Sequence, residues 1–290
     1  GGAYNTALGS DALTDNTTGS RNTAVGQGSL ADNLSGSYNT AVGRESLFLN
    51  TTASENTAVG YQAGYSNTTG YNNTLVGRKA LFANTTGHSN AALGWNALNA
   101  NTSGSNNVAI GLQSLTANTT ASENTAVGYQ AGLDNTTGTG LVSVGYQAGA
   151  SNTTGNYNVS LGRRALYLTT TGASNTAIGT AALYPNTTGN YNVAVGQQAL
   201  NANTTASNNT AVGYQAAYAN TTGVENVAIG KEALYSNTTA NQNTAVGVFS
   251  LRDNTTGASN VALGRYTLFD NTTGYENTAV GSAALYTNTT

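Results

Sequence analysis

Side chains able to do acid–base, nucleophilic or metal chemistry are scarce in this chain. Cysteine is absent, His88 is the single histidine, and charged residues make up 7% of the sequence, against roughly 25% in ordinary globular proteins. Without cysteine, no disulfide framework, thiolate metal site or cysteine nucleophile is available. We interpret His88 as a surface variant, because equivalent places in the repeats described below carry Ser, Tyr or Asn. We predict a protein that is not an enzyme and that binds no cofactor and no metal.

The charge balance narrows the range of partners. The formal net charge is -3, and no basic footprint for nucleic acid or polybasic membrane-binding segment is present. The sequence also has no apolar run of about 18 residues that could span a bilayer. We therefore expect neither nucleic-acid binding nor membrane insertion by this segment.

The sequence has a strict internal period. The pentapeptide Asn-Thr-Ala-Val-Gly at residues 22–26 recurs in close variants, and its last glycine returns every 17 residues from Gly9 to Gly281. A fixed period without insertions indicates a repeat array in which each repeat contacts mainly its neighbours. We expect one continuous domain over residues 1–290. Because the chain opens and closes inside a repeat, we expect a fragment of a longer polypeptide.

Charged residues occupy only a few places in the repeat. Counted from its first Asn as position 1, the repeat reads N-T-A-V-G-x-x-A-L-x-x-N-T-T-G-x-x. Every Asp, Glu, Lys and Arg falls at position 6, 7, 10, 11 or 17. We predict that these positions face water and that the others are buried, in contact or in tight turns.

Positions 2 to 4 indicate a short strand. Position 4 is always Val, Leu or Ile and position 2 is Thr, Val or Ala, so we predict that both face inward while position 3, mostly Ala, faces outward. Gly at position 5 then turns a corner that needs a residue without Cβ. A second arm has a small residue at position 8 and usually Leu at position 9, and Asn-Thr-Thr-Gly forms the second corner.

Stacked coils of this kind predict an all-β fold, a parallel β-solenoid of 17 coils with 17 residues each. A helical fold is rejected because Gly, Asn and Thr recur every few residues. Asn is missing at position 1 only at Leu141 and at position 12 only at Thr169, so we expect amide ladders between coils. Position 12 also starts an N-x-Ser/Thr sequon, for which we prefer the ladder role over glycan attachment.

Four repeats lack Leu at position 9, and each of them carries Tyr at position 6. We predict that the Tyr ring refills the volume of the missing side chain. The pairs are Gly64 with Tyr61, Gly132 with Tyr129, Gly149 with Tyr146, and Ala217 with Tyr214.

Positions 1, 3 and 5 make an uncharged strip that we predict to be an interface between copies of the chain. Its alanines at position 3 include Ala24, Ala58, Ala92, Ala126, Ala177, Ala211 and Ala245. Aromatic residues at position 10 are candidates for contact with a host-surface or matrix glycan or protein, although we favour the alternative that they cover the edge of the solenoid. They include Tyr65, Phe82, Tyr167, Tyr184 and Tyr235.

The NTAVG…AL…G pattern resembles the β-roll head of YadA-type trimeric autotransporter adhesins. The NTAVGYQA…NTTG phrasing at residues 124–138 is similar to repeats in phage tail fibres and related trimeric surface proteins. The resemblance implies a left-handed parallel β-roll, a homotrimer with the NTAVG arms at its threefold axis, and adhesion by an extracellular fibre on a cell surface or virion. The repeat here is longer than the adhesin repeat, with the extra length around NTTG.

Two other functions remain open. An ice-binding solenoid would use regular ranks of hydroxyls, here the threonine pairs at positions 13 and 14 such as Thr68-Thr69 and Thr187-Thr188. A weaker alternative is a filament subunit whose coils continue end to end between chains.

Overall fold

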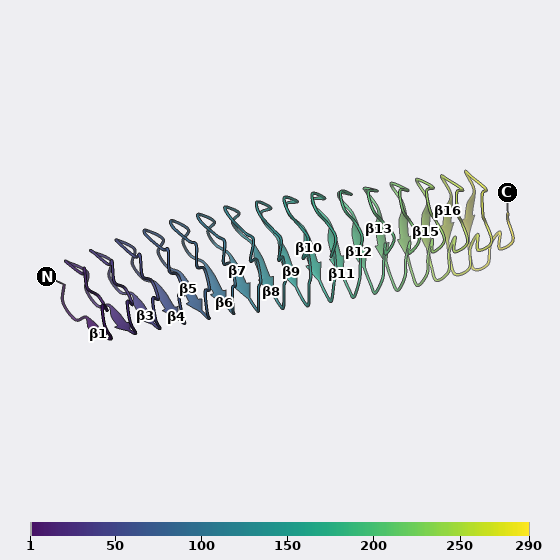
Figure 1. Ribbon diagram of the computed structural model, residues 1–290. Coiled ribbons are helices and arrows are strands. Elements are labelled where there is room, and N and C mark those ends of the chain that lie inside the picture. The colour runs from purple at the N-terminus through teal and green to yellow at the C-terminus, as the bar shows by residue number, and fades with distance from the viewer. Residues whose placement is uncertain (1, 290) are drawn as a thin grey trace. The chain divides into compact units, whose positions relative to one another are not determined.

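The computed structural model describes residues 2–289, which contain strands, turns and bends but no helix. Each repeat forms one coil with a three-residue strand at positions 2 to 4 (Figure 1). The predicted all-β parallel solenoid with a 17-residue period is confirmed. The strands are β1 (Thr6–Leu8), β2 (Thr23–Val25), β3 (Thr40–Val42), β4 (Thr57–Val59), β5 (Thr74–Val76), β6 (Ala91–Leu93), β7 (Val108–Ile110), β8 (Thr125–Val127), β9 (Val142–Val144), β10 (Val159–Leu161), β11 (Thr176–Ile178), β12 (Val193–Val195), β13 (Thr210–Val212), β14 (Val227–Ile229), β15 (Thr244–Val246), β16 (Val261–Leu263) and β17 (Thr278–Val280).

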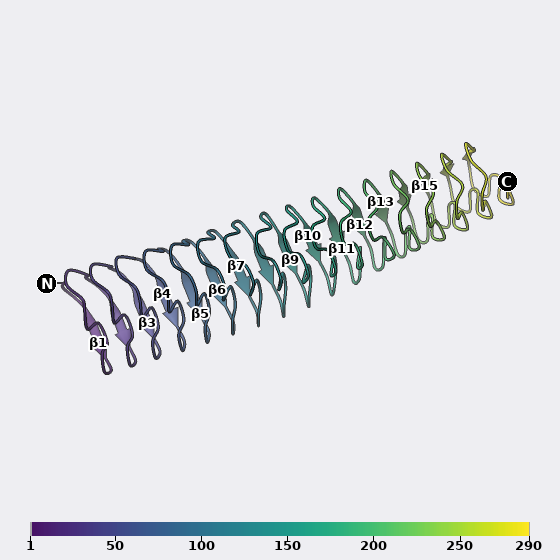
Figure 2. The same cartoon turned by 45° about the horizontal axis from the view of Figure 1, so that its top comes forward.

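The coils group into two compact units, unit 1 at Gly1–Val144 and unit 2 at Gly145–Thr290. Unit 1 holds β1 to β9 and unit 2 holds β10 to β17. Inside each unit neighbouring strands pair in parallel with equal positions opposite one another, as Ala24 pairs with Ala41 in β2 and β3. In unit 1 the strands from β3 to β7 lie side by side in one sheet (Figure 2). Each position of the repeat therefore becomes a column along the stack.

The corner at position 5 requires glycine, as predicted. Gly111 has a φ of 128°, and a Cβ added to it would lie 2.5 Å from the carbonyl oxygen of Gly128 in the next coil. A second feature was not predicted: positions 7, 9 and 17 adopt the left-handed region even without glycine. Leu47 at position 9, for example, has a φ of 47°. Burial of the Leu side chain must offset the strain of about 1 kcal/mol or more at this position.

The two faces of the strand are the reverse of the prediction. Ala at position 3 is buried, whereas positions 2 and 4 face outward. In β4, for example, Thr57 and Val59 are exposed and Ala58 between them is buried. The predicted interface alanines are all 0% exposed within their own chain, so they have no surface to offer a partner: Ala24, Ala58, Ala92, Ala126, Ala177, Ala211 and Ala245. The physical reason is a thin coil, in which the small side chain of Ala fits between the strand and the Leu of the second arm in most coils.

The core of each unit is built from alanines at positions 3 and 8 and from Leu at position 9. In unit 1 these side chains form one buried cluster that includes Ala41, Leu47 and Ala63. Unit 2 has an equivalent cluster that includes Ala194, Leu200 and Ala216. The absence of charged residues at positions 8 and 9 predicted a buried or tightly packed second arm, and its burial is confirmed.

The space left by Gly64 at position 9 is filled by leucines of adjacent coils, and the predicted filling by Tyr61 was wrong. A Cβ on Gly64 would lie 2.7 Å from Leu75 Cδ1 and 2.9 Å from Leu47 Cδ2. Leu75 stands at position 3, where most coils carry Ala. Tyr at position 6 lies outside the coil in all four repeats concerned, with exposed fractions of 36% at Tyr61, 39% at Tyr129, 44% at Tyr146 and 43% at Tyr214.

Two amide ladders run through the buried interior, as predicted. At position 12, Asn50 Nδ2 donates to Asn33 Oδ1 of the preceding coil at 2.8 Å and to the carbonyl of Ala53 in its own coil at 3.0 Å. At position 1, Asn22 Oδ1 accepts from the backbone N–H of Asn39 in the next coil at 2.9 Å. The ladders satisfy backbone and amide groups that would otherwise be buried without partners, which holds a core of few large side chains together.

Candidate binding surface

The outward face of the sheet is an uncharged strip, here named the sheet strip, made of the side chains at positions 2 and 4. In unit 1 its position-4 column includes Val76 at 40%, Leu93 at 38% and Ile110 at 38% exposure. Leu161 and Ile229 hold the same place in unit 2, at 43% and 39%. Because strand pairing is in register, these aliphatic side chains form a regular column within each unit.

The position-2 column beside it carries hydroxyl and aliphatic groups. Thr23, Thr40, Thr57 and Thr74 follow one another in β2 to β5. In unit 2 the column alternates between Val and Thr from Val159 to Thr278. The sheet strip holds no nucleophile, acid or base, so what it can do is contact another flat and mostly apolar surface.

The aromatic residues predicted as surface contacts stack on one another along position 10. Tyr65 lies between Phe48 and Phe82, with ring centroids 5.3 Å apart on each side. Tyr167 stacks on Tyr184 at 5.3 Å. Tyr235 continues the pattern in β14's coil, 5.1 Å from Tyr218. All five predicted residues are half-buried, and their ring faces contact each other, so they cover the edge of their own coils.

A second aromatic column, at position 6, was missed by the sequence interpretation. Arg44, Tyr61, Arg78 and Trp95 follow one another in successive coils of unit 1. The guanidinium carbon of Arg78 lies 6.0 Å from the Tyr61 ring centre and 5.6 Å from the Trp95 ring centre. The alternation of Arg with aromatic residues at one position was visible in the sequence and could have predicted this ladder.

An acidic hollow of about 280 Å³ opens in unit 1 beside the coil that contains β2. It exists because Gly28 and Ala31 stand at positions 7 and 10, where neighbouring coils carry larger side chains. Phe48 lines one side. Its acidic lining residues are Asp11, Asp15, Asp32 and Glu45. Burial, followed by repulsion from Asp15, raises the pKa of the Asp32 carboxyl above its ordinary value.

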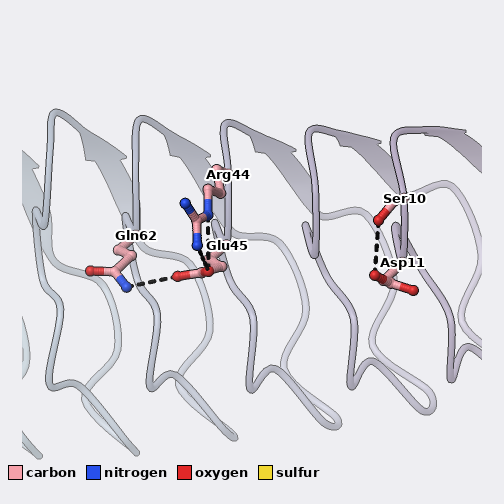
Figure 3. A network of polar contacts seen from close by, with 5 residues as sticks. All are labelled: Ser10, Asp11, Arg44, Glu45 and Gln62. Atoms are coloured by element: carbon pink, nitrogen blue, oxygen red, sulfur yellow. Dashed lines mark hydrogen bonds and ion pairs between the residues drawn. The ribbon is translucent and has the colours of Figure 1, made fainter.

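Glu45 at the rim of the hollow is held by two donors. Gln62 Nε2 donates to Glu45 Oε2 at 2.7 Å, and Arg44 Nη2 donates to Oε1 at 2.9 Å (Figure 3). The hydrogen bond from Gln62, with those from Arg44, holds the pKa of Glu45 below its ordinary value. Within residues 2–289, no three His, Cys, Asp or Glu side chains are arranged to hold a metal ion.

His88 lies apart from these groups, on the second corner. Its ring stacks on Tyr71 at 4.7 Å, and its Nδ1 lies 3.4 Å from Ser89 Oγ.

Comparison with known proteins identifies no family for this chain. A scan against protein-family models finds no match, and a search of curated proteins finds no significantly similar sequence. In the described part of the chain, no helix is long and apolar enough to cross a membrane.

Proposed function

We propose that this chain is a non-enzymatic structural and adhesive module, the β-solenoid shaft or head of a homotrimeric extracellular fibre on a cell surface or virion. The observation that carries the proposal is the sheet strip. An uncharged face that repeats on every coil is unusual for an isolated soluble surface, and such faces mark association sites.

The sheet strip replaces the buried alanines as the proposed interface. Its aliphatic column is partly exposed in each unit, at 38% for Leu93 and 43% for Leu161. Burying apolar surface stabilises by about 25 cal/mol per Å², so a small gain per coil adds up along a stack. A trimer would bring three such strips together around one axis, in the arrangement that the resemblance to YadA-type heads implies.

The test is the solution mass measured by light scattering, with a matched pair of triple variants. The first variant, Val76→Lys, Leu93→Lys and Ile110→Lys, places charges on the sheet strip. The second, Thr69→Lys, Thr86→Lys and Ser103→Lys, places the same charges at exposed position 14 of the same unit.

We expect a wild-type mass of about three times the 29.2 kDa chain, unchanged in the position-14 variant and reduced to one chain in the strip variant. Circular dichroism of both variants should match the wild type. A wild-type monomer at every concentration, or a strip variant that remains trimeric, would refute the proposed interface. Ala126→Arg does not test assembly, because Ala126 lies inside its own coil.

An ice-binding function is the second candidate. The threonines that support it are those of the sheet strip and not the pairs at positions 13 and 14. Thr68 at the corner donates its hydroxyl hydrogen to the carbonyl of Thr85 at 2.9 Å. This hydroxyl at position 13 therefore already donates a hydrogen bond within the protein. The outward threonines of the sheet strip, such as Thr40 and Thr57, instead stand on a regular parallel sheet. A thermal-hysteresis assay separates the candidates, because a fibre module should show no gap between the melting and freezing points.

A further inference from the structure

Two pairs of adjacent cations stand in otherwise almost uncharged parts of the chain. Arg78 and Lys79 are the only Asp, Glu, Lys or Arg residues between Glu55 and Glu123. Arg163 and Arg164 are likewise alone between residues 134 and 225. Both pairs occupy positions 6 and 7 of their repeat. Each therefore makes a positive patch on a chain whose net charge is -3.

Aromatic rings hold the pair in unit 1. Arg78 is exposed, and its guanidinium lies against Tyr61 at 6.0 Å on one side and Trp95 at 5.6 Å on the other. Lys79 Nζ lies 5.0 Å from the Phe82 ring centre. A cation within about 6 Å of an aromatic ring centre is attracted to the ring, and the exposure of Arg78 leaves its N–H donors accessible.

The pair in unit 2 repeats this arrangement. Arg163 lies 5.9 Å from the Tyr146 ring centre. Arg164 lies 5.4 Å from Tyr167 and donates from Nε to Gln147 Oε1 at 2.9 Å. In both units a Tyr at position 6 of the preceding coil and an aromatic residue at position 10 of the same coil flank the cations. The two units thus share the cation pair and these two rings, whereas Trp95 of unit 1 is replaced by Thr180 in unit 2.

Among the other cations, Arg44, Lys231 and Arg252 pair with neighbouring acids. Arg21 and Arg265 stand singly, and each donates to a tyrosine hydroxyl. Arg44 pairs with Glu45 at 2.9 Å. Arg252 pairs with Glu232 at 3.1 Å and with Asp253 at 2.7 Å. By contrast, no described acid lies within ion-pairing distance of Arg78, Lys79, Arg163 or Arg164, and no described side chain accepts a hydrogen bond from Arg78 or Arg163. Arg78 and Arg163 are exposed to solvent, and Lys79 and Arg164 are partly exposed.

We propose that each of these two basic–aromatic clusters binds an anionic polysaccharide through its sulfate or carboxylate groups. Planar guanidinium groups bind such oxyanions through paired hydrogen bonds. Cation–π contacts with rings on two sides restrict Arg78 before the ligand arrives, which lowers the conformational entropy lost on binding. The exposed edges of Tyr61, Trp95 and Tyr146 offer apolar surface to the sugar rings beside those groups.

A polysaccharide fits these clusters better than a nucleic acid does. Nucleic-acid affinity comes from many phosphate contacts at close spacing, whereas each cluster offers two cations on an acidic chain. A polysaccharide carries its anionic groups between sugar rings, so a few contacts separated by apolar surface match its chemistry. This inference deepens the adhesive role proposed above by naming its ligand class. The experiment below measures ligand binding and does not depend on the oligomeric state. The inference would therefore hold even if the chain proved to be a monomer.

The test compares two quadruple variants that remove the same number of positive charges. The cluster variant is Arg78→Gln, Lys79→Gln, Arg163→Gln and Arg164→Gln. The control variant is Arg21→Gln, Arg44→Gln, Arg252→Gln and Arg265→Gln. Binding of a size-defined heparin oligosaccharide, of hyaluronate and of oligo-dT is measured by titration calorimetry. Trp95, the single tryptophan, reports on the unit 1 cluster by its fluorescence. Circular dichroism checks that both variants fold.

We expect heparin or hyaluronate to bind the wild type and to change Trp95 fluorescence. The cluster variant should bind at least about tenfold more weakly, the loss expected for removing charge-assisted hydrogen bonds, while the control variant keeps its affinity. Tighter binding of heparin than of hyaluronate would identify sulfate as the group that the clusters bind. Tighter binding of hyaluronate would identify carboxylate. Absence of binding, equal loss in both variants, or tighter binding of oligo-dT than of either polysaccharide would overturn the proposal.

Discussion

Replacing Thr169 with Asn tests whether the position-12 amide ladder stabilises the solenoid. Thr169 is the one residue that interrupts the run of Asn at this position. It is fully buried, and its Oγ1 has no hydrogen-bond partner. In the next coil Asn186 Nδ2 donates to Gly189 O, at 3.0 Å, and lacks the ladder acceptor that the equivalent asparagines use. Thr169→Asn should restore the missing rung.

The expected gain in stability can be worked out from a coil in which the position-12 ladder is complete. Asn50 donates to Asn33 Oδ1 at 2.8 Å and to Ala53 O at 3.0 Å, and its Oδ1 accepts from Asn67 at 3.1 Å. A buried hydrogen bond contributes about 1 kcal/mol net, and an unsatisfied buried hydroxyl costs about 1 to 3 kcal/mol. Thr169→Asn should therefore stabilise by roughly 2 to 4 kcal/mol. At about 2 °C per kcal/mol for a chain of this size, the melting temperature should rise by roughly 4 to 8 °C.

The assay is thermal unfolding followed by circular dichroism, with amide hydrogen exchange to locate the gain. Thr169→Val keeps the shape and removes only the unpaired hydroxyl, so it should recover a smaller part of the gain. Thr188→Asn, at an exposed position 14, should leave the melting temperature unchanged. If Thr169→Asn melts no higher than the wild type, or no higher than Thr169→Val, the ladder does not contribute as argued.

Two further predictions concern the core and the acidic hollow. Leu75→Ala should destabilise by about 2 to 5 kcal/mol through a cavity, and Gly64→Leu should destabilise by overpacking against Leu75 and Leu47. Their double variant should unfold close to the wild type in denaturant, because it restores the usual Ala and Leu; additive losses would contradict the direct contact. Asp32 has a raised pKa, so its charged form lowers stability once the pH rises through that pKa. Asp32→Asn should melt higher than the wild type at about pH 7 and equally at about pH 3, and an equal difference at both pH values would exclude titration as the cause.

The sequence by itself determined the period, the fold class and the amide ladders. A strict repeat of 17 residues without insertions places equal positions above one another, so an Asn in every repeat has another Asn as its neighbour along the stack. The positions that carry charge do face solvent, since no charged residue of the described chain is buried. Positions 2, 4 and 14 also face solvent without carrying charge, which the charge pattern did not predict. The stacking of equal positions and the amide ladders depend only on which residues lie next to each other in successive coils, and the 17-residue period specifies those neighbours.

Only the tertiary structure decided which side of each strand faces the core. Residues two apart share a face in a strand, but this alternation is the same whether positions 2 and 4 or position 3 point inward. The choice depends on the width of the coil, which in turn depends on the left-handed backbone of residues such as Leu47 and on how far Leu reaches from the second arm. For the same reason Leu75, and not Tyr61, fills the space beside Gly64. The period specifies the neighbours along the stack, whereas the direction of a side chain across the coil is set by packing in the closed structure.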